Sequence, residues 1–117
     1  MHKDWPAIAR ELGTAMGIAR KGSPDAWTAF SGLAKAATAP GALDPKTKEL
    51  IALALGIAAR CDGCLAFHAK AVAQLGGTRE EVLDVIGMSL YMGGGPSAMY
   101  GAQALEAYDQ FTAKAAA

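Results

Sequence analysis

The chain has 117 residues, a length that suits one domain built around a single hydrophobic core. Hydrophobic residues make up 52% of it and charged residues 19%, which is more apolar surface than so short a chain can easily bury, so we expect a homo-oligomer. Eleven basic residues balance eleven acidic ones, which leaves no broad positive field to attract nucleic acid or an anionic membrane surface.

The opening residues, Met-His-Lys-Asp-Trp-Pro, carry acid and proline where a secretory signal needs an apolar run. No stretch approaches the ~18 consecutive apolar residues of a membrane-spanning helix. We therefore expect a cytoplasmic protein that does not enter a membrane.

Three helices are predicted in the first half of the chain. Asp4 before Trp5-Pro6 is typical of a helix N-cap, and this helix should end near Gly22. Ser23-Pro24 gives a second start, and an apolar stripe of core character follows before Ala39-Pro40-Gly41 ends the helix. The stripe consists of Trp27, Phe30, Leu33, Ala34 and Ala37. A third helix opens at Asp44-Pro45 and is apolar on nearly every face from 50 to 59, so we expect it to be central and buried.

Three more helices are predicted in the second half. One follows Cys61-Asp62-Gly63-Cys64 and ends at Gly76-Gly77, a pair suited to a left-handed turn. The next begins in the capping-box pattern Thr78-Arg79-Glu80-Glu81, and the last follows the break at 93–96. That glycine run lacks the Lys-Ser or Lys-Thr and the preceding strand of a phosphate loop, so we interpret it as a hinge. Since no segment alternates with period two, the expected fold is all-α: a compact single-domain bundle of about six helices over residues 1–117.

The two cysteines, Cys61 and Cys64, are the main functional clue. A Cys-x-x-Cys pair in a cytosolic chain indicates redox chemistry or metal binding rather than a structural disulfide. In the first turn of a helix their thiolates would be stabilised by the helix dipole, and the spacing brings the sulfurs close enough to form and break a disulfide.

His68 lies four residues after Cys64, hence on the same helix face, where it can accept or return a thiol proton. If the preceding helix folds back antiparallel, Glu49 reaches a similar height and could orient this imidazole. The alternative is that Glu49, next to Lys46 and Lys48, is a solvated residue favoured by the helix dipole.

Zinc is the chemical alternative, with Cys61, Cys64 and His68 as three possible ligands. A closed site needs a fourth, and the candidates are His2, in a terminus expected to fray, and Glu49. Covalent haem is weaker, because Leu65 occupies the position at which a Cys-x-x-Cys-His motif needs histidine. We predict no metal and no cofactor.

These residues resemble the AhpD-like alkylhydroperoxidase group of the carboxymuconolactone decarboxylase superfamily. Its pattern is a glutamate, a Cys-x-x-Cys twelve residues later and a histidine four residues beyond, which Glu49, Cys61, Cys64 and His68 reproduce. The similarity spans roughly residues 40 to 90 and includes the apolar helix before the cysteines and the turn at 75–81.

The resemblance implies an all-helical fold assembled as trimers, hexamers or related oligomers. It further implies that Cys64 attacks a hydroperoxide and becomes a sulfenic acid, and that Cys61 resolves it as an internal disulfide. Glu49 and His68 would form the proton relay. A dithiol donor, such as a lipoyl protein or a thioredoxin-like protein, would restore the thiols.

One departure concerns Gly63, because peroxidase members of the group carry a histidine directly before the second cysteine. Its loss should weaken thiol activation, which leaves general disulfide exchange as an alternative to peroxide defence. Two other functions remain open: a lactone decarboxylase with incidental cysteines, although such members typically lack the pair, and a non-catalytic metal-binding oligomer.

Overall fold

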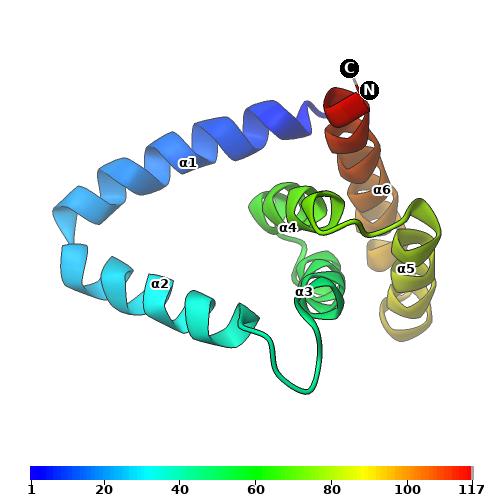
Figure 1. The fold of residues 1–117 in the computed structure, drawn as a ribbon. Coiled ribbons are helices and arrows are strands. Elements are labelled where there is room, and N and C mark those ends of the chain that lie inside the picture. Colours follow the sequence, from blue (N-terminus) through cyan, green and yellow to red (C-terminus); the bar gives the residue numbers. More distant parts are fainter. Residues whose placement is uncertain (117) are drawn as a thin grey trace.

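The structure, a computed structural model, describes residues 1–116, which form six α-helices and no strand. The helices are α1 (Trp5–Gly22), α2 (Pro24–Thr38), α3 (Pro45–Ala59), α4 (Asp62–Gln74), α5 (Arg79–Gly93) and α6 (Gly95–Ala116). Helices α3 to α6 form a body in which α3 packs against α4 and α5, and α6 packs against the same two helices (Figure 1). The predicted all-α class and the six helices are confirmed.

Helix starts follow the predicted capping residues. The Asp4 carboxylate accepts a hydrogen bond from the Ala7 amide at 3.0 Å, and Asp44 caps α3 in the same way. Thr78 and Glu81 form the complete capping box, with each side chain accepting from the other residue's amide. These bonds satisfy amides that have no partner inside the helix. At Ser23 the helix starts as predicted, but the hydroxyl makes no capping hydrogen bond.

Helix ends depend on left-handed backbone at three described residues. Gly76 after α4 and Gly94 after α5 have φ of 79° and 67°, which glycine adopts without strain. Arg60 after α3 has φ of 55° and is not glycine. The break at Gly93-Gly94-Gly95 separates α5 from α6, and its role as a hinge stays a prediction.

The hydrophobic core lies inside the body and reaches the start of α1. Its largest fully buried side chains are Trp5, Leu53, Ile57, Leu65, Val72 and Val82. Helix α3 is central, but the expectation that it is buried all round is wrong: Leu55 is 64% exposed, because α4, α5 and α6 do not surround it.

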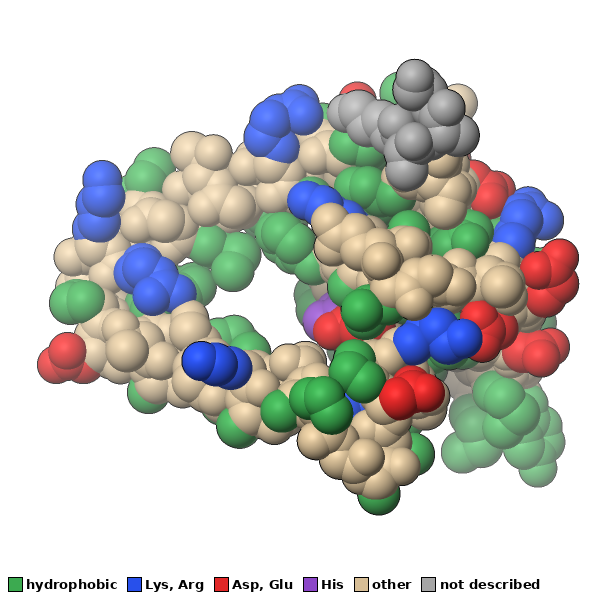
Figure 2. Space-filling model, in the orientation of Figure 1, with side chains coloured by type: hydrophobic (Ala, Val, Ile, Leu, Met, Phe, Trp, Pro, Cys, Tyr) green, Lys and Arg blue, Asp and Glu red, His purple; other side chains and the backbone are tan. Residues whose placement is uncertain are grey.

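The first turns of α1 pack on α4 and α6, whereas the rest of α1 and α2 form an arm that returns to the body only where the chain enters α3 (Figure 1). Helix α2 buries no side chain fully, and Phe30 and Leu33 are 62% and 64% exposed. The prediction that its apolar stripe belongs to the core is therefore wrong within this chain. The space-filling view shows an opening between arm and body with hydrophobic side chains along its edge (Figure 2).

The first residues are held against α6 rather than frayed, which corrects the expectation for His2. The Glu106 carboxylate accepts hydrogen bonds from the His2 and Lys3 amides at 2.6 and 2.9 Å, and from the Trp5 indole N–H at 2.8 Å. Among the described helices, none combines the length and the hydropathy needed to cross a bilayer.

Candidate functional site

A tight turn between α3 and α4 builds the site. The left-handed Arg60 ends α3, and the Cys61 amide donates back to the Gly56 carbonyl at 3.1 Å. Helix α4 then begins at Asp62, so Cys61 is its N-cap residue and Cys64 lies in its first turn. The expectation that both cysteines lie inside that turn needs this small correction: Cys61 stands just before it.

Cys61 and Cys64 are joined by a disulfide, with their Cα atoms 5.2 Å apart. The Cys64 amide donates a hydrogen bond to the Cys61 sulfur at 3.1 Å. An amide at a helix N-terminus carries partial positive charge, so the same contact would stabilise a thiolate at Cys61 once the bond is reduced.

His68 and Glu49 face each other across α3 and α4. The His68 Nδ1 lies 2.6 Å from a Glu49 carboxylate oxygen, and the Glu49 side chain is only 11% exposed against 34% for His68. The structure thus brings these side chains into contact, as counting residues from the turn predicted. A carboxylate bonded to Nδ1 fixes the ring orientation and leaves Nε2 for proton exchange.

Helices α3 and α4 approach closely at Cys64 because α3 carries a glycine there. A Cβ atom on Gly56 would lie 3.0 Å from the Cβ of Cys64, so a larger residue would push the helices apart. On the other side of the turn, a Cβ on Gly63 would lie 2.8 Å from a methyl group of Leu12 in α1. Leu12 therefore occupies the space next to the position at which the resemblance to the AhpD-like group implies a histidine.

Lys3 is a neighbour of the cysteine turn that the sequence did not reveal. Its ammonium lies 2.7 Å from the carboxylate of Asp62, a residue that stands between the two cysteines in the sequence. It also lies 2.7 Å from the Gln103 side-chain oxygen on α6. A separation of 59 residues gives no local signal for this contact. The bond ties the turn to the anchored N-terminal segment, although an ion pair this exposed adds little stability.

The residues proposed as zinc ligands are arranged differently from a closed metal site. Within the described part of the chain, no group of three or more His, Cys, Asp or Glu side chains is placed to hold an ion. In the disulfide state the two sulfurs are bonded to each other and are not thiolate ligands.

A family model and a solved structure identify the same family. Residues 24–107 match the carboxymuconolactone decarboxylase family. An uncharacterised protein of Cupriavidus necator is 40% identical over 113 residues, covering 97% of this chain and all of that protein. An uncharacterised protein from the cox locus of Paracoccus denitrificans is 34% identical over 70% of this chain and 74% of its own length. The crystal structure of an apo carboxymuconolactone decarboxylase family protein from Legionella pneumophila superposes with a TM-score of 0.89, at 51% identity over 92% of this chain and 96% of that one.

Proposed function

The chain belongs to the carboxymuconolactone decarboxylase family, and on this basis we propose that it is an AhpD-like thiol oxidoreductase that reduces hydroperoxides or disulfides in the cytoplasm. One observation carries the proposal. The Cys61–Cys64 disulfide spans the start of the helix that carries His68, and His68 contacts the nearly buried Glu49. A redox-capable sulfur pair beside an oriented imidazole has the parts that thiol chemistry needs.

In the oxidative half, the Cys64 thiolate attacks one oxygen of a hydroperoxide and the O–O bond breaks. The leaving alkoxide takes a proton from the His68 imidazolium, which Glu49 stabilises, and Cys64 becomes a sulfenic acid. Cys61 then attacks the Cys64 sulfur, water leaves, and the disulfide forms. One hydroperoxide is reduced to an alcohol and water while two thiols are oxidised.

In the reductive half, a dithiol donor attacks the Cys64 sulfur and Cys61 leaves as a thiolate. The Cys64 amide, which points at the Cys61 sulfur, favours this leaving group because it already donates to it. A second attack within the donor releases reduced Cys64. We propose a lipoyl protein or a thioredoxin-like protein as the donor, since both supply paired thiols.

The balance between peroxide and disulfide substrates depends on Gly63. With no imidazole at this position, thiol activation rests on His68 and on the helix N-terminus. The Gly63→His variant, made together with Leu12→Ala to free the adjacent space, should therefore react faster with peroxide.

A thiol count tests the proposal directly. The reduced protein should lose both thiols on treatment with one equivalent of hydrogen peroxide or cumene hydroperoxide, and dihydrolipoamide should restore them. In Cys61→Ser, mass spectrometry should find the sulfenic acid on Cys64, trapped by dimedone. Trapping only at Cys61 in Cys64→Ser would reverse the roles.

Two outcomes would reject the proposal. Thiols that survive both peroxide and a small disulfide would exclude redox chemistry at this pair. Lactone decarboxylation retained by Cys64→Ser would make the cysteines incidental.

A further inference from the structure

We propose that a cavity between α1, α4 and α6 binds an organic carboxylate with an aromatic body. The cavity measures about 730 Å³, within the range of small-molecule sites. Its lining includes none of Glu49, Cys61, Cys64 and His68. The proposal is thus independent of the function proposed above.

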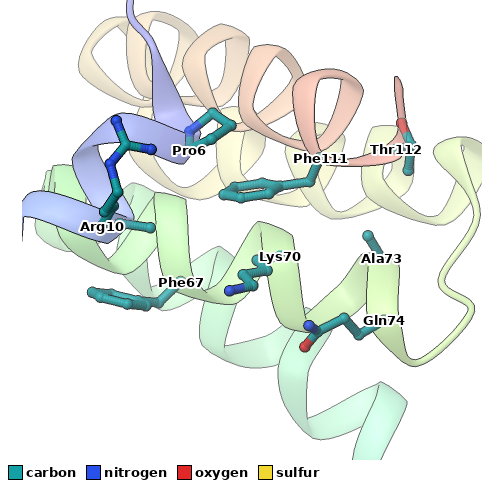
Figure 3. A pocket seen from close by; sticks show the side chains of 9 residues that line it. Pro6, Arg10, Phe67, Lys70, Ala73, Gln74, Phe111 and Thr112 are labelled. Atoms are coloured by element: carbon teal, nitrogen blue, oxygen red, sulfur yellow. The ribbon is translucent and has the colours of Figure 1, made fainter. Parts of the chain in front are cut away.

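The walls of the cavity are aromatic and apolar. Phe67 of α4 and Phe111 of α6 face the space from two helices, and Pro6 and Ala9 line it from α1 (Figure 3). Both phenylalanines are half-buried and pack against the core, which holds the rings in place. A planar ring between them gains apolar contact together with the offset or edge-on geometry that aromatic pairs prefer.

The charges of the cavity favour an anion. Arg10 enters its lining from α1 and Lys70 from α4, and the lining contains no Asp or Glu. Neither cation takes part in any ion pair among residues 1–113. Gln74 adds an amide donor at the end of α4. Cations at the edge of apolar walls suit a carboxylate on a hydrophobic body better than a fully hydrated inorganic anion.

An NMR titration of the ¹⁵N-labelled protein with 3-phenylpropionate tests this proposal. Amide shifts should change along residues 7–10, 67–74 and 111–112, with saturation in the high micromolar to millimolar range expected of so small a ligand. Two matched probes separate the contributions: 3-phenylpropanol keeps the ring without the charge, and propionate keeps the charge without the ring. Each should bind about tenfold more weakly.

Single substitutions locate the site. Lys70→Gln and Arg10→Gln should each weaken the binding of 3-phenylpropionate about three-fold, as expected for a partly exposed charge pair. The double variant should weaken it about tenfold. Gln74→Glu, which adds a negative charge at nearly constant shape, should weaken it as well. Lys35→Gln on α2 removes a cation outside the cavity and serves as the control.

Three results would overturn the proposal. They are equal affinity for the alcohol and the carboxylate, equal losses in Lys35→Gln and Lys70→Gln, and amide shifts confined to residues outside the cavity.

Discussion

Glu49 shows how much a single residue depends on its surroundings. Read from the sequence, it was either a relay carboxylate or a solvated residue beside two lysines. Its side chain is 11% exposed and contacts His68, so the solvated interpretation does not describe its position. The contact supports a relay, but the catalytic role itself stays a prediction.

We predict that Glu49 and His68 act as one unit on the Cys64 thiol. In a Cys61→Ser background, Glu49→Gln or His68→Gln should slow alkylation of Cys64 at pH 7 by roughly three- to tenfold, because each removes a charge-assisted hydrogen bond worth about 1 kcal/mol. The double variant should alkylate only slightly more slowly than either single variant, because the effects of substituting groups that act as one unit are not additive. The measurement is the rate of iodoacetamide alkylation against pH.

The alkylation test has a control variant and two outcomes that would contradict the prediction. Glu11→Gln removes an exposed carboxylate on α1 and should leave the alkylation profile unchanged. An unchanged profile in Glu49→Gln would restrict this residue to a structural role. Fully additive losses would mean that the two residues act separately.

At the scale of helices, the first and last residues of each helix could be predicted well from the sequence, because helix termini depend on neighbouring residues. Asp4, Asp44 and Thr78 each accept a hydrogen bond from the amide three residues onward, so the sequence pattern contains its own partner. Contacts between distant segments carry no such signal. The anchoring of residues 2–5 by Glu106 and the placement of Lys3 against Asp62 both span a large part of the chain.

We predict that Glu106 stabilises the fold through its charge. Burial opposes its ionisation, but hydrogen bonds from the His2 and Lys3 amides and the Trp5 indole outweigh this effect and hold the pKa of Glu106 below its ordinary value of 4.5. Glu106→Gln keeps an acceptor oxygen and loses the charge. It should lower the free energy of unfolding by about 1 to 2 kcal/mol at pH 7, measured by urea denaturation at one protein concentration.

The pH dependence of this difference follows from the lowered pKa. The unfolded chain takes up a proton at this carboxyl before the folded one, so the stabilisation is fully present above about pH 4.5 and disappears as the pH falls through the folded-state pKa. The difference in free energy of unfolding between the unaltered protein and Glu106→Gln should therefore become smaller as the pH falls. Glu11→Gln again serves as the control, and a gap that is constant down to pH 3 would contradict an electrostatic contribution of Glu106.

At the scale of the whole molecule, exposed apolar surface gathers in two places. The arm presents Ile18, Phe30 and Leu33, and the body presents the set Leu55, Met88, Tyr91, Met92 and Met99, each more than 60% exposed. The sequence indicated the excess but placed the stripe of α2 in the core, because helical spacing shows that a face is apolar and not what covers it. A helix of 15 residues with so little packing is marginal by itself, so α2 needs a partner.

We predict that the partner is a second copy of this chain and that the protein is a homo-oligomer, a trimer or hexamer in keeping with the resemblance. Burying a Phe or Leu side chain contributes about 1.5 to 3 kcal/mol, so covering the stripe of α2 in each subunit would hold an assembly together at micromolar concentration. Replacing Phe30 and Leu33 by Asp should raise the dissociation constant more than tenfold and give smaller particles in light scattering. Thr28→Asp, a control on the opposite side of the same helix, should leave the assembly intact. A monomer mass for the unaltered protein at micromolar concentration would contradict the prediction, and an unchanged assembly of Phe30→Asp/Leu33→Asp would assign the contact to the other apolar surface.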